Sequence, residues 1–204
     1  DEHENTFVGQ EAGTTTTGVG FAVAVGAGAM NAGDATSGAD GTVAVGASAL
    51  SALTSGAGNT AVGYQAGTTH ATTGLNTLLG YRAGRYSVGT NNVYVGHTSG
   101  EGTASGTYTG ANNVGIGYQS LAAATTGGSN TSIGSTAGDA LTTGSLNVFI
   151  GKDAGTGTLV GLKNVLIGES AGAGVLTTAA VGTVAIGYVA GNAITSGAGN
   201  TAVG

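Results

Sequence analysis

The chain has 204 residues, of which 43 are Gly, none is Pro or Cys, and only 7% are charged. A net charge of −6 with four basic residues excludes the clustered Lys and Arg of nucleic-acid binding, and no apolar run is long enough to span a bilayer. Because 40% of the residues are hydrophobic, a Gly-rich disordered chain is excluded as well, and small side chains stacked in a regular array are favoured.

A short phrase, Asn-Thr/Val-x-Val/Ile-Gly-x-x-Ala-Gly, recurs from the first residues to the last. The first clear copy begins at Asn5 and the last, cut short, at Asn200. Seven of the eleven intervals between the repeat glycines are seventeen residues, and these glycines stand at Gly9, Gly26, Gly46, Gly63, Gly80, Gly96, Gly117, Gly134, Gly151, Gly168, Gly187 and Gly204. Self-similarity at a fixed period predicts a repeat architecture.

Each repeat glycine follows three residues that predict a short β-strand. The residue before the glycine is Val, Ile or Leu in all twelve copies, and Thr or Val stands two positions earlier, as in Thr6 and Val148. This period-two pattern predicts that these two positions form the buried, β-branched face of the strand.

The remaining columns of the repeat predict corners and a ladder. The residue three positions after the glycine is Ala in nine of eleven copies and Ser in the other two, Ser99 and Ser120. Only small side chains occur at this position, which predicts a narrow inward corner. Steps such as Thr72-Thr73-Gly74 predict a second corner. The asparagines that begin the repeats are expected to stack amide on amide along the axis: Asn5, Asn59, Asn76, Asn92, Asn113, Asn130, Asn147, Asn164 and Asn200.

One repeat cannot bury its own apolar stripe, whereas stacked copies can. We therefore expect residues 1–204 to form a single all-β segment, a parallel β-solenoid (β-roll or β-helix) of about twelve 17-residue coils. With coils ~4.8 Å apart, the rod would be roughly 55–60 Å long. We expect this segment to be a fragment of a longer fibre.

The middle residue of each predicted strand should point away from the solenoid's own core, yet ten of the twelve are apolar or aromatic. They are Phe7, Ala24, Ala44, Ala61, Leu78, Tyr94, Gly115, Ser132, Phe149, Leu166, Ala185 and Ala202. Both faces of the strand would then be buried, which favours identical chains packed around an axis. A flattened single-chain solenoid covered by another domain is the alternative.

The NTAVGYQAG-type repeats, linked by TTG steps, resemble the collar-like repeats of phage tail-fibre proteins and of bacterial surface proteins with tail-fibre domains. More distantly, they are similar to the left-handed β-roll head of trimeric autotransporter adhesins. The resemblance covers the chain from Asn5 to Gly204. It implies a parallel homotrimer that serves mainly as a scaffold, often followed by a C-terminal intramolecular chaperone.

The sequence offers no convergent set of catalytic groups. His3, His70 and His97 fall in unrelated coils, acidic residues are scattered singly, and the nonapeptide of calcium-binding β-rolls is absent, so we expect no enzyme activity, cofactor or metal site. Asp34 and Asp40 flank a Ser-Gly-Ala turn, which is more typical of a solvated loop than of a calcium site.

Ligand binding has a few candidate residues. Tyr64, Tyr81, Tyr118 and Tyr188 each follow a repeat glycine, and rings in register could stack on sugars, although tyrosines also simply favour strands and cover the neighbouring backbone. Insertions at 27–41, 97–112 and 169–182 could carry specificity, the second containing His97, Glu101 and Tyr108.

Together these patterns predict a structural or adhesive fibre segment that spaces or presents a receptor-binding region, in a phage tail fibre or a bacterial surface adhesin. The expected partners are copies of the same chain, a trimer above all, and a host-surface glycan or receptor, with no nucleic acid and no membrane insertion. The expected location is extracellular, in a virion or at a cell surface. The alternatives are an ice-binding or glycan-binding solenoid module; a polysaccharide-degrading solenoid would need paired carboxylates that the sequence does not offer.

Overall fold

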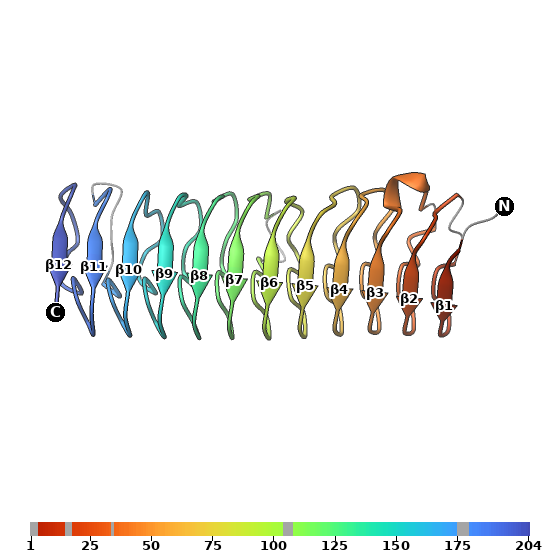
Figure 1. The fold of residues 1–204 in the computed structure, drawn as a ribbon, viewed down its shortest axis with the longest axis horizontal. Helices are drawn as coiled ribbons and strands as arrows, with labels where there is room; N and C mark the ends of the chain where they lie inside the picture. Colours follow the sequence, from red (N-terminus) through yellow and green to blue (C-terminus); the bar gives the residue numbers. More distant parts are fainter. Residues whose placement is uncertain (1–3, 15–17, 34, 104–107, 175–179) are drawn as a thin grey trace.

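The computed structural model describes residues 4–14, 18–33, 35–103, 108–174 and 180–204. The chain winds into a parallel β-solenoid of about eleven turns with twelve strands, which lie side by side in one sheet with the two termini at opposite ends of a rod (Figure 1). The strands are β1 (Thr6–Val8), β2 (Val23–Val25), β3 (Val43–Val45), β4 (Thr60–Val62), β5 (Thr77–Leu79), β6 (Val93–Val95), β7 (Val114–Ile116), β8 (Thr131–Ile133), β9 (Val148–Ile150), β10 (Val165–Ile167), β11 (Val184–Ile186) and β12 (Thr201–Val203). The predicted all-β parallel solenoid with a period near seventeen residues is confirmed.

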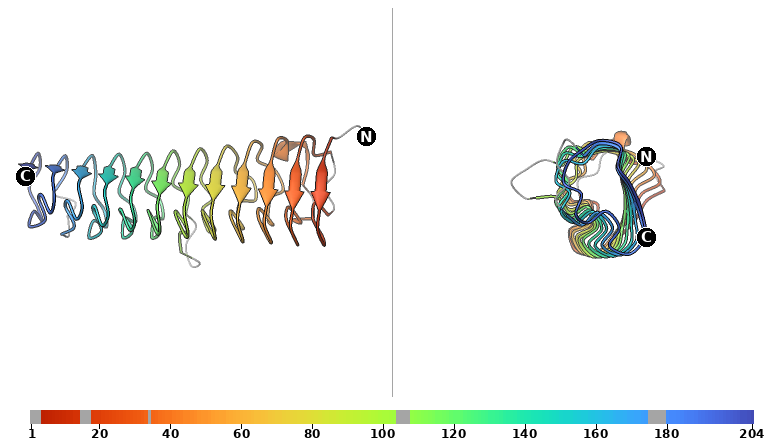
Figure 2. Two further views of the ribbon diagram at one scale, coloured as in Figure 1. Left: turned by 60° about the horizontal axis from the view of Figure 1, so that its bottom comes forward. Right: turned by 90° about the vertical axis from the view of Figure 1, so that its left-hand side faces the viewer.

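The strands pair in the order of the sequence, and equivalent residues of the repeat lie opposite each other. Thr6 pairs with Val23 at one end of the rod, and Ile186 pairs with Val203 at the other. Viewed along the axis, the coils superimpose and the strands share one side of the cross-section (Figure 2). Each column of the sequence is therefore a row along the rod.

The repeat glycines make the corner at the end of each strand. All twelve have φ between +127° and +143°, a backbone conformation that side chains disfavour. A Cβ at Gly63 would lie 2.2 Å from the carbonyl oxygen of Gly80 in the next coil, so neighbouring backbones are in contact here. Only glycine permits both the conformation and the approach.

The residue two positions after the repeat glycine also has a positive φ, usually without being glycine. Gln65, Arg82 and Thr98 have φ values of 55°, 56° and 54°. The next residue then donates its N–H to the carbonyl of the repeat glycine, as Ala66 does to Gly63 at 3.3 Å. The predicted corner alanines are buried as expected, for instance Ala49 and Ala83, because they face the interior of this turn.

The strand centres face the interior, so the prediction about which face of the strand is buried was wrong. Ala44, Leu78, Tyr94 and Phe149 are completely buried, whereas Val8, on the flank of β1, is 56% exposed. The strand centres fill the narrow interior of the coil, and the β-branched residues on either side of the centre point outward. The middle column is the core of one chain and carries no argument for several chains.

The core is filled by two columns that compensate each other in volume. The position four residues after the repeat glycine faces the strand centre across the interior, and it is glycine where the strand centre is large. A Cβ at Gly100, for example, would lie 2.5 Å from the ring of Tyr94. Where the strand centre is Ala44 or Gly115, the same position carries buried Leu50 or Leu121 instead. In the coils of Ala61, Ser132 and Ala185 both columns are small, and side chains of neighbouring coils fill the space, as Leu50 and Leu78 do beside Gly67.

The predicted asparagine ladder is confirmed from Asn59 to Asn164, but Asn5 and Asn200 are not part of it, because other residues stand between them and these asparagines. Each Oδ1 accepts the backbone N–H of the next member, as Asn130 Oδ1 does from Asn147 N at 3.0 Å. Asn147 Nδ2 also donates to Asn130 Oδ1 at 2.9 Å. Buried amides that satisfy each other and the backbone stabilise the stacking, since a buried polar group left unpaired is costly. Ala22, Thr42 and Thr183 occupy this column elsewhere.

His70 lies in the core, and its side chain is completely buried. Neither ring nitrogen has a hydrogen-bond partner within the described part of the chain, and burial lowers the pKa of the imidazole from 6.5 to about 4. The unfolded chain therefore binds a proton between these two pH values that the folded chain does not.

Acidification is expected to destabilise the fold through His70. Because the unfolded state binds more protons between pH 6.5 and 4, stability rises with pH in this window, and the free energy of unfolding should fall by up to about 3 kcal/mol from pH 7 to pH 4. Denaturant unfolding of the wild type and of His70→Leu at several pH values measures this. The variant should lack this part of the pH dependence; identical pH profiles for the two proteins would contradict it.

The first insertion contains the 3-10 helix η1 (Ser37–Ala39), which begins after Thr36. In the second insertion, Tyr108 folds back into the core, and the Tyr94 hydroxyl donates to the Tyr108 hydroxyl. Burial raises the pKa of both phenols above the ordinary value of 10. This pair ties the insertion to the solenoid.

Candidate functional site

The outward face of the sheet is a mostly aliphatic stripe. It consists of the first and third residues of all twelve strands, hereafter the sheet face, and these 24 positions hold 19 aliphatic residues, five threonines and no charge. Leu79, Ile116, Ile133 and Ile186 on it are 47%, 37%, 37% and 39% exposed. With strands ~4.8 Å apart, the sheet face extends for about 53 Å along the rod.

Around the corner from the sheet face, four aromatic rings form a second row, hereafter the aromatic ladder. It consists of Tyr64, Tyr81, His97 and Tyr118, each directly after a repeat glycine. Successive ring centroids lie 5.4, 4.8 and 5.5 Å apart, with the planes inclined by 15° to 29°. The rings thus stack on one another along the axis and leave their edges toward solvent.

A charged cluster lies beside the aromatic ladder. Arg82 and Arg85, in the coil of β5, share the carboxylate of Glu101 in the next coil, with N···O distances of 3.7 and 3.9 Å. Arg82 also lies over the Tyr81 ring at 5.4 Å, and its Nε donates to Gln65 Oε1 at 3.3 Å. Two cations and one carboxylate give this cluster a local positive charge.

The structure brings together some of the predicted ligand-binding residues and separates others. Tyr64, Tyr81, His97, Tyr118 and Glu101 lie in four consecutive coils. Tyr188 is exposed but stands apart, because Ser135, Lys152 and Glu169 occupy its column in the three coils between.

Tyr108 cannot contribute to an exposed binding loop, because its side chain is completely buried against Tyr94; its prediction as a surface ligand-binding residue was wrong. Parts of the three insertions, residues 34, 104–107 and 175–179, lie outside the described residues, and Asp34 is among them. The carboxylate of Asp40 accepts the backbone N–H of Gly20 at 2.7 Å, so it is engaged in a structural hydrogen bond.

A second charged group follows three coils farther on, around Lys152. Its ammonium lies 2.8 Å from Asp153 and 3.6 Å from Glu169. The Lys152 ammonium and the Thr136 hydroxyl donate to Asp153 and hold the pKa of that carboxyl below its usual value. Two carboxylates surround one cation here, so the net charge of this group is negative, whereas that of the arginine cluster is positive.

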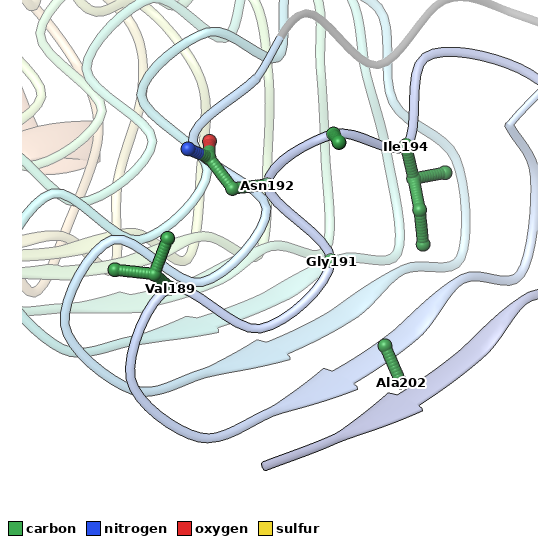
Figure 3. Close-up of a pocket in the computed structure, with 6 residues that line it drawn as sticks. Val189, Gly191, Asn192, Ile194 and Ala202 are labelled. Atoms are coloured by element: carbon green, nitrogen blue, oxygen red, sulfur yellow. The ribbon is translucent and has the colours of Figure 1, made fainter.

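A hollow lies at the C-terminal end of the rod, where Ala202 of β12 faces the interior (Figure 3). It is lined by Val189, Gly191, Asn192, Ala193, Ile194 and Ala202. Asn192 is the one polar side chain among these lining residues, and none of them is titratable. The hollow is the interior of the coil between β11 and β12.

Across the described residues, no group of three or more His, Cys, Asp or Glu is placed to hold a metal ion. Nor does the described part of the chain contain a helix with the length and apolar character needed to cross a membrane. No protein-family model, curated protein or solved structure matches the chain.

Sequence reasoning missed Arg82 and Arg85 because no motif marks them. Counting from the repeat glycine would have found Arg85: it stands five residues after Gly80, and Glu101 stands five residues after Gly96, so the two meet in adjacent coils. The same count places His97 in the tyrosine column rather than in an insertion.

Proposed function

We propose that this chain is a rigid structural segment of an extracellular fibre, a phage tail fibre or a bacterial surface adhesin, in which identical chains pack through their sheet faces. The observation that carries the proposal is the sheet face itself, an apolar stripe without a charge along the whole rod. A monomer in water normally presents polar residues on the open side of a sheet. An exposed apolar area of this extent marks a surface that another molecule covers.

The area of the sheet face can be compared with that of a protein interface. A stripe about 53 Å long and about 12 Å wide covers on the order of 600 Å², or about 300 Å² against each of two neighbours, so it would be the apolar centre of a wider interface of ~800 Å² per partner. Homo-oligomers usually have closed symmetry, and three parallel rods around an axis would turn all three faces inward. In register, Val and Ile columns of one chain would then meet the same columns of its neighbours.

The mechanism of such a segment is mechanical. The strands pair in register from β1 to β12, so interstrand hydrogen bonds parallel to the axis join every coil to the next and stiffen the rod. Burial of the sheet face would add interchain contacts to each coil. The fibre would hold a receptor-binding region at a fixed distance from its anchor.

An ice-binding role is less well supported by the outward residues. All five threonines of the sheet face stand in the first column, at Thr6, Thr60, Thr77, Thr131 and Thr201, and none stands in the third. A regular two-column array of hydroxyls is therefore absent from the sheet face, and aliphatic residues dominate it.

A charge placed in the sheet face tests the proposal. The wild type should migrate as an oligomer in detergent and resist proteinase K. Ile133→Lys/Ile150→Lys should yield protease-sensitive single chains, because an unpaired buried charge costs several kcal/mol whereas an exposed one costs little. Ser135→Lys, an exposed position off the sheet face, should behave like the wild type. Equal detergent and protease resistance of the double variant and the control would refute the sheet-face interface.

A further inference from the structure

The arginine cluster has unsatisfied binding capacity. Glu101 is the only carboxylate paired with Arg82 and Arg85 among the described residues, and both distances exceed 3.5 Å. Arg85 Nε is buried and has no hydrogen-bond partner within that part of the chain. The side chains of Arg82, Arg85 and Glu101 remain 33%, 18% and 19% exposed, so a ligand can reach them. In a chain of net charge −6, two of the four basic residues stand at this one place.

The aromatic ladder next to the cluster offers ring edges rather than ring faces. Tyr81 is stacked between Tyr64 and His97, and the Arg82 guanidinium also lies 5.4 Å from its ring centroid, so neither ring face is free. The edge of an aromatic ring carries the positive end of its quadrupole, and tyrosine adds a hydroxyl that donates or accepts. A neutral sugar lying flat on the inner rings is therefore excluded, whereas an anionic group at the edges is favoured.

Glu101 restricts the ligand further. It repels a bare polyanion such as a phosphate backbone, which has no donors to offer it, but it accepts hydrogen bonds from hydroxyl groups. A ligand that suits both the arginines and Glu101 carries a carboxylate and several hydroxyls on one small frame. An acidic sugar, a uronic or sialic acid unit, has this combination.

We propose that Arg82, Arg85 and Glu101, with the edges of Tyr81 and His97, form a binding site for a carboxylate-bearing sugar, hereafter the acidic-sugar site. The guanidinium groups hold the carboxylate, Glu101 and the Tyr81 hydroxyl bind sugar hydroxyls, and the ladder provides the wall beside them. All residues of the site belong to one chain, so binding does not require the oligomer. Only the biological role of the site, contact with a cell surface, rests on the proposed fibre function. A fibre segment with this site contacts surface polysaccharide along its side as well as at a tip.

Binding of the intact chain to an array of uronate- and sialate-bearing oligosaccharides, each beside its neutral counterpart, tests the proposal. We expect at least one acidic member to bind severalfold better than its neutral counterpart. Arg82→Gln/Arg85→Gln should reduce that binding at least about tenfold, because one charge-assisted hydrogen bond contributes about 1.5 kcal/mol or more. Lys152→Gln/Lys163→Gln removes the same two charges elsewhere and should leave binding unchanged.

Three results would overturn the acidic-sugar site: acidic members bind no better than neutral ones, both double variants lose binding equally, or poly-glutamate binds as well as the sugars. The first removes the site, the second indicates non-specific attraction, and the third indicates an acidic peptide as the ligand. The melting temperature and solution mass of the arginine variant should match those of the wild type. A failure here leaves the oligomeric fibre intact, and a monomeric wild type that binds acidic sugar would refute the fibre proposal alone.

Discussion

Replacing Gly134 with alanine is expected to destabilise the solenoid by at least about 3 kcal/mol, through both backbone strain and overlap with the next coil. Gly134 has φ +143°, and a Cβ there would lie 2.4 Å from the carbonyl oxygen of Gly151. The neighbour is backbone, so it cannot turn aside, and moving it breaks the hydrogen bond from Gly151 N to Ile133 O. Each coil rests on the next, so a local clash separates the stack at that level.

Denaturant unfolding of Gly134→Ala measures this loss, with Gly41→Ala as its matched control. Gly41 also has a positive φ, +67°, but a Cβ there meets nothing within 4 Å. The control therefore carries only the conformational cost of about 1 kcal/mol. If the two variants lose the same stability, close backbone approach is not what requires glycine in this column.

Removing one member of the asparagine ladder is expected to have a similarly large effect. Asn113 Oδ1 accepts from Asn130 N and Asn130 Nδ2 at 3.0 and 3.1 Å, and Asn113 Nδ2 donates to Gly127 O at 3.1 Å. Asn113→Ala leaves Asn130 N and Gly127 O buried without these partners, whereas Asn130 Nδ2 keeps its hydrogen bond to Gly144 O at 2.9 Å. At about 1–3 kcal/mol for each unpaired group, the expected loss is about 4 kcal/mol. The loss falls on both adjacent coils.

Asn112→Gly provides the comparison for the ladder variant. Asn112 precedes Asn113, is exposed and has φ +61°, which glycine adopts freely, so its stability should change by less than about 1 kcal/mol. Hydrogen exchange of the Asn130 amide should accelerate in Asn113→Ala and stay slow in Asn112→Gly. Protection of that amide in both variants would show that the ladder does not stabilise the stack.

The architecture could be predicted because a solenoid repeats its constraints in every coil. Twelve glycines at a near-constant interval gave the coil length, the Ala and Ser column gave the inward corner, and the Asn column gave the ladder. Each of these residue types is required by backbone geometry or by a hydrogen bond that recurs, so its column stays nearly uniform. A single coil would not have been interpretable.

The side of the strand that faces the core was predicted wrongly because residue type was read in isolation. Val and Ile are typical of buried strand faces, and Ala24, Gly115 and Ser132 are too small to suggest a core. The sequence does contain the deciding pattern. Large Tyr94 and Phe149 pair with Gly100 and Gly155 four residues after the repeat glycine, and two columns that share one space must compensate in volume.

The candidate sites were less predictable than the fold because they depend on contacts between coils of different length. The interval before Gly96 is sixteen residues and the one after it is twenty-one, which placed His97 in an apparent insertion. In the structure His97 is stacked between Tyr81 and Tyr118, and the side chain of Tyr108 is buried in the core. Such adjustments follow from packing in three dimensions, which the one-dimensional pattern does not contain.

The central claim is that the sheet face is covered by other copies of the chain. The most direct test is the mass of the segment in solution, measured by light scattering after size exclusion, where one chain has a mass of 19.0 kDa. We expect the mass of three chains, independent of dilution over the micromolar range. A single-chain mass with the sheet face open to solvent would contradict the claim.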